Sequence, residues 1–155
     1  MANKRSAGIL LFRRTRGELE VLLGHMGGPL WSRREEAAWS VPKGEYLADE
    51  KALDAARREF TEELGIPVPD VELVELGEVR QKSGKVVSLW TGEGDLDLTG
   101  FAPGSFDMEW PRASGRMQSF PEIDRVAWLE LAAARVALVA YQREFLDRLV
   151  ALLDS

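Results

Sequence analysis

The stretch from Gly44 to Ile66, GEYLADEKALDAARREFTEELGI, holds the most regular helical pattern in the chain. Apolar side chains recur in it every three or four residues, at Leu53, Ala56, Phe60 and Leu64. This spacing is typical of an amphipathic helix with one face on a core. Asp49 can cap the start of that helix, and Gly65 ends the pattern. The sequence therefore predicts a helix over residues 49–64.

The last turns of this helix carry three glutamates, Glu59, Glu62 and Glu63. Spacings of three and four residues place their carboxylates side by side on one helical face. The carboxylates repel one another there and crowd the negative end of the helix dipole, at a cost of roughly 0.3–1 kcal/mol for each unfavourable interaction. An arbitrary acidic cluster usually belongs to a solvated surface. A cluster that breaks two local rules is also a candidate site for a hard divalent cation such as Mg²⁺ or Mn²⁺.

The residues around the cluster decide between these two interpretations. Gly44 is followed after five residues by Glu50, and after seven more by the run Arg58-Glu59-Phe60-Thr61-Glu62-Glu63-Leu64-Gly65-Ile66. This pattern resembles the Nudix box, G-x5-E-x7-R-E-U-x-E-E-x-G-U, in which U is a bulky apolar residue. Agreement at every specified position would arise by chance with a probability on the order of 10⁻⁶ to 10⁻⁵. Phe60 stands where the family more often has an aliphatic residue, and we expect this difference to affect packing alone.

The resemblance to the Nudix family implies an α/β fold in which helices sandwich a mixed β-sheet in an α/β/α arrangement. It implies a hydrolase that cleaves a phosphoanhydride bond of a nucleoside diphosphate linked to another group X, with Mg²⁺ or Mn²⁺ as cofactor. The metal ligands that it implies are the carboxylates of Glu59, Glu62 and Glu63 and the backbone carbonyl of Gly44. Divalent ions suit this reaction because they neutralise phosphate charge and activate water.

The same resemblance implies roles for residues that flank the glutamates. Arg58 can reach Glu62 one helical turn away, and in the family it pairs with box glutamates, so Arg58 and Glu50 are expected to orient the carboxylates. Lys43 directly precedes Gly44 and is expected to contact a substrate phosphate. The alternative for Lys43 is a solvated loop lysine.

The identity of the general base stays open between two kinds of residue. It is either a box glutamate, Glu62 or Glu63, or an acidic residue outside the box. Glu122 is the outside candidate, because it resembles the glutamate that precedes the last strand in many family members. Glu109 and Asp124 are weaker alternatives.

Outside the box, apolar runs bounded by turn residues predict two β-hairpins, a short strand and a final strand: 7–12 with 19–23, 71–81 with 86–90, 39–41, and 123–129. The glycine-rich segment 91–119 predicts long loops, which often contact substrates. The chain from Leu131 onward predicts one or two helices. His25, the only histidine, has no Cys or His partner for a metal site, and we expect a structural or solvent-facing residue.

The 155-residue chain has the size and composition of one globular domain, so we expect a single domain over residues 1–155. Its formal net charge of -6 argues against a general polyanion binder, because such proteins carry an excess of Lys and Arg. The absence of cysteine excludes disulfides and thiolate metal ligands. The apolar run 7–12 is too short for a signal peptide and no segment reaches the length of a membrane span, so we expect a cytoplasmic protein.

Sequence features beside the box favour a nucleotide polyphosphate as substrate, either a nucleoside triphosphate or a dinucleoside polyphosphate. Residues 7–14 and the approach Trp39-Ser40-Val41-Pro42-Lys43-Gly44 resemble hydrolases of diadenosine polyphosphates, diphosphoinositols and RNA 5′ ends. The closest overall resemblance is to bacterial Nudix proteins of the nucleoside triphosphate pyrophosphohydrolase type. Nucleic acid is otherwise not an expected partner. The resemblance also allows a homodimer.

A different class of function stays open, because some Nudix domains have lost catalysis and serve as ligand-sensing or protein-binding modules. The complete set of box carboxylates argues against that alternative. Trp31 and Trp110 fall in predicted loops and are candidates for stacking on a nucleobase, although packing is the commoner role of each. Basic residues that could hold distal phosphates are Lys82, Lys85, Arg112 and Arg116, and each is more commonly a solvated surface charge.

Overall fold

A computed structural model of the chain describes residues 4–155. Its strands are β1 (Arg5–Thr15), β2 (Glu18–Met26), β3 (Trp39–Ser40), β4 (Lys43–Tyr46), β5 (Val74–Arg80), β6 (Val86–Glu93), β7 (Ser105–Glu109), β8 (Met117–Pro121) and β9 (Ile123–Glu130). Its helices are α1 (Ala52–Leu64), α2 (Leu131–Ala137) and α3 (Arg143–Leu153), with the short 3-10 helices η1 (Leu98–Gly100) and η2 (Ala140–Gln142).

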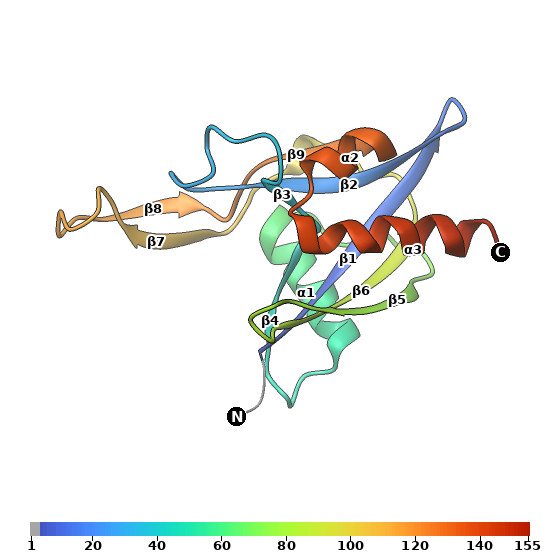
Figure 1. Cartoon of the computed structure of the whole chain (residues 1–155), viewed down its shortest axis with the longest axis horizontal. Coiled ribbons are helices and arrows are strands. Elements are labelled where there is room, and N and C mark those ends of the chain that lie inside the picture. Colours follow the sequence, from blue (N-terminus) through green and yellow to red (C-terminus); the bar gives the residue numbers. More distant parts are fainter. Residues whose placement is uncertain (1–3) are drawn as a thin grey trace.

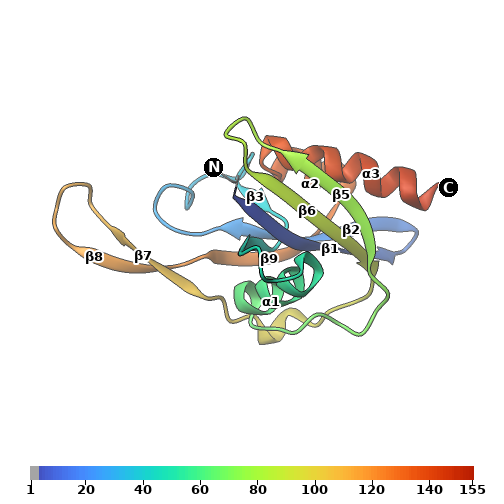
Figure 2. The same cartoon turned by 90° about the horizontal axis from the view of Figure 1, so that it is seen from below.

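The main sheet has seven strands in the order β3-β2-β1-β6-β5, with β4 paired to β1 and β9 paired to β2. β1 and β6 run parallel, whereas β1 and β2 run antiparallel, so the sheet is mixed. Figure 2 shows α1 on one side of this sheet and α2 and α3 on the other. The predicted α/β/α sandwich with a mixed sheet is confirmed.

Alternation along β1 explains why the sheet carries helices on both faces. Ala7, Ile9 and Leu11 belong to the apolar cluster that packs under α1, whereas Leu10 and Phe12 belong to the cluster that packs under α3. Successive side chains of a strand point to opposite faces, so a central strand that is apolar at every position needs cover on both sides. The N-terminal strand thus contributes side chains to the core that supports the box and to the core on the opposite face.

Phe60 fills the centre of the cluster under α1 and is fully buried. Replacing Phe60 with leucine, an aliphatic residue as in many family members, should lower the free energy of unfolding by about 1–2 kcal/mol, since the removed ring atoms leave a small cavity. Turnover per folded molecule should stay near that of the wild type. Urea denaturation and a kinetic assay on the same sample check both expectations, and a large drop in kcat would contradict a role in packing alone.

Two features differ from the sequence prediction. The helix begins at Ala52 and not near Asp49, and its cap residue, Lys51, makes no side-chain capping hydrogen bond. The segment 91–119 is also more ordered than predicted, because β6 continues to Glu93 and a hairpin of β7 and β8 follows. Phe106, Met108 and Trp110 alternate with polar residues there, but the glycines and prolines of the segment favoured long loops.

The β7–β8 hairpin is a separate two-stranded sheet that projects from the body of the molecule (Figure 1). It leaves the body directly beside the C-terminal end of α1, where the N–H of Gly104 donates to the carbonyl oxygen of Glu62 at 3.1 Å. Within residues 4–155, no helix combines the length and the apolar composition needed to cross a membrane.

Candidate active site

The pairing of β4 with β1 places Gly44 beneath the last turns of α1. Gly44 lies opposite Ala7 in this pairing, and a methyl group added to Gly44 would overlap the carboxylate of Glu59. The glycine therefore lets a backbone strand approach the carboxylate more closely than any other residue would. Glu59 itself is only 9% exposed, and this burial raises the pKa of its carboxyl group.

Glu63 faces the same strand from the next turn of the helix. Its carboxylate accepts a hydrogen bond from the backbone N–H of Lys43 at 3.2 Å. Burial, together with the nearby charges of Glu122 and Glu59, raises the pKa of Glu63 to about 8, against the opposing effect of the Lys43 ammonium group and backbone N–H. The structure thus brings together five residues from three separate segments of the chain: Lys43 and Gly44, Glu59 and Glu63, and Glu122.

Arg58 forms hydrogen bonds with three carboxylates of the box. Its Nε and Nη2 donate to the two oxygens of Glu50 at 2.9 and 2.8 Å, and its Nη1 donates to Glu59 at 2.8 Å and to Glu62 at 3.2 Å. The guanidinium lowers the pKa of Glu50, and the three carboxylates together raise the pKa of Arg58. Glu62 is the most accessible of the group, with its side chain 57% exposed.

Glu122 is held by backbone hydrogen bonds from two segments that the sequence analysis did not connect with it. Its N–H donates to the carbonyl oxygen of Gly104 at 2.9 Å, and its own carbonyl oxygen accepts from Gly27 at 3.0 Å. The end of β2, the root of the β7–β8 hairpin and the end of α1 therefore meet at this residue. Gly27 and Gly104 both fall in segments that the sequence predicted as loops, so no local pattern indicated these contacts.

The two weaker candidates for the general base lie in different surroundings. Asp124 sits at a break in the pairing of β2 with β9 and contacts Nδ1 of His25 at 2.8 Å. His25 is fully buried, and its Nε2 lies 2.6 Å from the carbonyl oxygen of Arg34, so it is a structural residue and does not face solvent. Glu109 lies out on the hairpin, where it accepts a hydrogen bond from the N–H of Ala113.

The chemistry of the donor set fits a hard divalent cation, since the carboxylates of Glu59 and Glu63 are desolvated and close to a third, Glu122. No three His, Cys, Asp or Glu side chains within the described part of the chain are arranged as a ready metal-binding group. Arg58 donates hydrogen bonds to Glu59 and Glu62, and the backbone N–H of Lys43 donates to Glu63. A bound cation would therefore compete with these hydrogen bonds.

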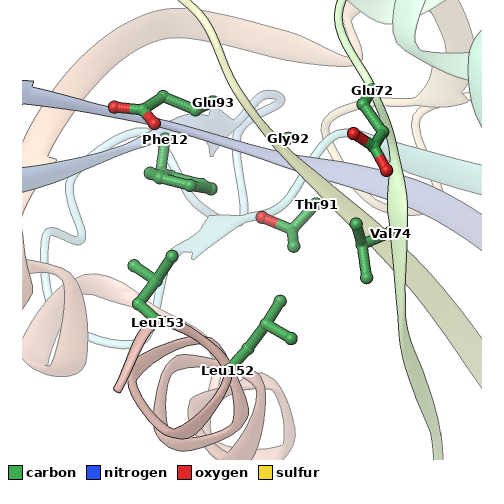
Figure 3. Close-up of a pocket in the computed structure, with 8 residues that line it drawn as sticks. All are labelled: Phe12, Glu72, Val74, Thr91, Gly92, Glu93, Leu152 and Leu153. Carbon is green, nitrogen blue, oxygen red and sulfur yellow. The ribbon is translucent and has the colours of Figure 1, made fainter. Parts of the chain in front are cut away.

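Two pockets elsewhere on the surface are lined by none of these residues. One, of about 310 Å³, lies between the end of α3 and strands β1, β5 and β6, and is lined by apolar side chains with Glu72 and Glu93 at its edge (Figure 3). The other, of about 410 Å³, lies beside α2 and includes Glu35 and Glu36. Both combine apolar walls with carboxylates, a setting that repels phosphate.

Comparison with known proteins identifies the class to which this arrangement belongs. The model of the NUDIX domain family matches residues 2–149, and the chain belongs to the Nudix family. It is a Nudix pyrophosphohydrolase, a hydrolase of nucleotide-linked substrates.

Among its relatives, the RNA pyrophosphohydrolase of Teredinibacter turnerae is 30% identical over 148 residues, which cover 77% of this chain and 86% of the relative. The RNA pyrophosphohydrolase of Pseudomonas putida is 40% identical over 55 residues, which cover 35% of each chain.

Solved structures show the same fold. The Ap4A hydrolase of C. elegans in a binary complex aligns with a TM-score of 0.67 at 23% identity and covers 97% of this chain and 98% of that one. A mutT/nudix family protein from Listeria innocua aligns with a TM-score of 0.66 at 16% identity, covering 99% and 96%. These identities are too low to transfer a substrate.

Proposed function

We propose that the chain works as a single domain, residues 1–155, that hydrolyses a phosphoanhydride bond of a nucleoside diphosphate linked to X, with Mg²⁺ or Mn²⁺. The substrate class is a nucleotide polyphosphate: a nucleoside triphosphate, a dinucleoside polyphosphate or the 5′ end of an RNA. The observation that carries the proposal is the gathering of Glu59, Glu63 and Glu122 around the Lys43 and Gly44 strand. Because its substrates are nucleotides, the cytoplasm is the compartment proposed for this activity.

The roles follow from where each group lies. Glu59, Glu62 and Glu63, with the carbonyl oxygen of Gly44, would hold the cation, which when bound neutralises phosphate charge and lowers the pKa of water. Burial among like charges supports this role, because a cation removes the unfavourable repulsion that the fold imposes on these carboxylates. The ammonium group of Lys43 stands next to Glu63 and would contact a phosphate oxygen there.

Hydrolysis then requires a base and a water molecule in line with the leaving phosphate. Water forms a new bond to phosphorus, the bridging P–O bond breaks, and a carboxylate takes the proton of the water. Glu122 is the proposed base, with Glu62 and Glu63 as the alternatives within the box. Two backbone hydrogen bonds, to Gly104 and from Gly27, support Glu122 in this role, since Gly104 in turn bonds to the backbone of Glu62.

Arg58 and Glu50 are proposed as positioning residues. Arg58→Lys removes the planar fork that contacts three carboxylates, and lysine, with a single ammonium, cannot replace it. We expect kcat/KM to fall by about 10- to 100-fold, as for other groups that orient metal ligands. Higher Mg²⁺ concentrations should restore part of the loss, and a loss that no concentration of Mg²⁺ relieves would contradict a positioning role.

A panel of substrates tests the proposed function. Purified protein is mixed with Mg²⁺ and, in separate reactions, with nucleoside triphosphates, dinucleoside polyphosphates, ADP-ribose and 5′-triphosphate RNA, and the products are separated by ion-exchange chromatography. We expect phosphoanhydride cleavage of at least one nucleotide polyphosphate. If nothing is cleaved at saturating metal, the proposal fails, and a non-catalytic ligand-sensing or protein-binding module takes its place.

A further inference from the structure

The β7–β8 hairpin begins and ends at the candidate active site. Gly104, just before β7, donates its N–H to the carbonyl oxygen of Glu62, and Glu122, just after β8, donates its N–H to Gly104. Figures 1 and 2 both show the hairpin extending away from the end of α1 and from the sheet. A molecule bound along the hairpin therefore has one end at the candidate catalytic glutamates.

One face of the hairpin carries aromatic residues at its root and toward its tip, with Met108 between them. Its antiparallel register places Phe106 opposite Phe120, with ring centroids 6.1 Å apart, and Met108 opposite Gln118. Trp110 continues this face, since side chains two residues apart along a strand point the same way. The root of the face is covered where Phe106 packs against Gly28, and Met108 and Trp110 are half-buried. In the described part of the chain, neither hydrophobic cluster of the core includes Met108 or Trp110.

The tip of the hairpin is basic in an otherwise acidic protein. Arg112 and Arg116 are exposed, and neither forms an ion pair with any residue between 4 and 155. The segment 110–118 contains no acidic residue. The tip thus offers positive charge and an aromatic ring together, which is the combination that holds the backbone and bases of single strands.

We propose that this face binds the nucleotides that follow the 5′-terminal one in a single-stranded polynucleotide with a 5′-polyphosphate. The inference rests on the proposed function of the site, and it assigns an extended substrate to it. A five-residue strand spans about 17 Å, so a mononucleotide held at Glu122 does not extend to Trp110, whereas a polynucleotide does. A polynucleotide fits this face better than a protein does. The face runs from the candidate phosphate site at its root to the exposed Arg112 and Arg116 at its tip.

Replacing Trp110 tests the stacking part of the proposal. Trp110→Ala should raise KM for a 5′-triphosphate RNA of about eight nucleotides by about fivefold or more, since stacking on one aromatic ring contributes that much to binding. KM and kcat for the corresponding nucleoside triphosphate should change less than about twofold. Trp110→Phe keeps an aromatic ring and should restore most of the affinity for RNA. A merely structural tryptophan would affect both substrates together.

Replacing the two arginines tests the electrostatic part. Arg112→Ser combined with Arg116→Ser should weaken RNA binding and reduce the slope of log Kd against log salt by about 1.4, or about 0.7 for each lost phosphate contact. Both side chains are exposed, so the fold should not change. The matched control is Arg16→Asn, which removes an exposed arginine from the turn between β1 and β2, at the opposite end of β2 from Gly27. The control should leave RNA binding unchanged.

The outcomes separate this proposal from the proposed function. If the wild type hydrolyses nucleotides and the variants handle RNA normally, the hairpin proposal is wrong and the enzyme assignment stands. If the wild type hydrolyses nothing, fluorescence anisotropy with a labelled 5′-triphosphate RNA still tests the hairpin, and equal binding by wild type and variants overturns it. A wild-type dimer that becomes a monomer in the hairpin variants, measured by light scattering, would also overturn it, because the face would then be a self-interface.

Discussion

Glu63→Gln is expected to reduce turnover of a nucleotide polyphosphate by about 10³-fold or more while the fold stays intact. Glutamine has the shape of glutamate and keeps an oxygen that can accept the hydrogen bond from the N–H of Lys43. It lacks the negative charge that a divalent cation requires from this position. Glu62→Gln should cause a loss of similar size, whereas Glu75→Gln, at an exposed position on the edge strand β5, should have no effect. Near-normal rates in both site variants would contradict the assignment.

The same substitution should change the pH dependence of stability in a defined direction. The pKa of Glu63 is raised to about 8 in the folded protein by burial, from an ordinary value of 4.5. Between these two values the folded state binds the proton and the unfolded state does not, so without metal the free energy of unfolding falls as the pH rises. Glu63→Gln removes this slope. At pH 8.5, metal-free Glu63→Gln should thus melt at a higher temperature than the wild type. At pH 4.5 the two proteins should melt at similar temperatures. Thermal melts in a chelating buffer measure the difference.

Gly44→Ala is expected to lower kcat by about 10²-fold, a loss typical of catalytic groups that are displaced by about an ångström. The new methyl group would occupy the space of the Glu59 carboxylate, which has to move away from the strand and from Arg58. Only the end of one flexible side chain has to move, so the stability of the protein should change little. The kinetic assay and a thermal melt of the same sample measure the two effects.

Gly17→Ala is the matched control for that prediction. Gly17 lies in the turn between β1 and β2 with φ of 80°, and a methyl group there meets no other atom within 4 Å. Alanine is strained in this left-handed conformation, at a cost of about 1 kcal/mol in stability, and the turn is remote from the site. The control should therefore lose stability and keep its activity. If Gly44→Ala kept its activity and Gly17→Ala lost activity, the close contact between Gly44 and Glu59 would not be important for function.

Most of the fold could be predicted from local patterns that are strong on their own. The apolar repeat through Phe60 and Leu64 predicted α1, and the alternating or continuous apolar runs predicted the strands of the main sheet. The start of α1 could not be predicted from the capping rule, because Lys51 holds that position without a capping side chain. The β7–β8 hairpin was not predicted either, because the glycines and prolines around it favoured loops over the short alternating run of Phe106, Met108 and Trp110.

The part of the candidate site that lies in one local sequence pattern was predicted, and the part that depends on long-range contacts was not. The box placed Gly44, Arg58 and the three glutamates in one pattern, and the structure brings them together. The position of Glu122 depends on long-range backbone hydrogen bonds to Gly27 and Gly104, which no local pattern contains. The net charge of -6 suggested a protein that avoids phosphate, yet seven of the 26 acidic residues lie between Glu45 and Glu63, where a bound cation would reverse the local sign.

Binding of Mn²⁺ measured together with turnover shows whether hydrolysis depends on a cation held by Glu63. Metal-free wild type and Glu63→Gln are titrated with Mn²⁺, free Mn²⁺ is followed by electron paramagnetic resonance, and hydrolysis of a nucleoside triphosphate or a 5′-triphosphate RNA is measured at each point. We expect bound Mn²⁺ and turnover to rise together in the wild type. Both should be lost or strongly weakened in Glu63→Gln. Full turnover in the presence of excess chelator, or equal Mn²⁺ binding by the two proteins, would contradict this dependence.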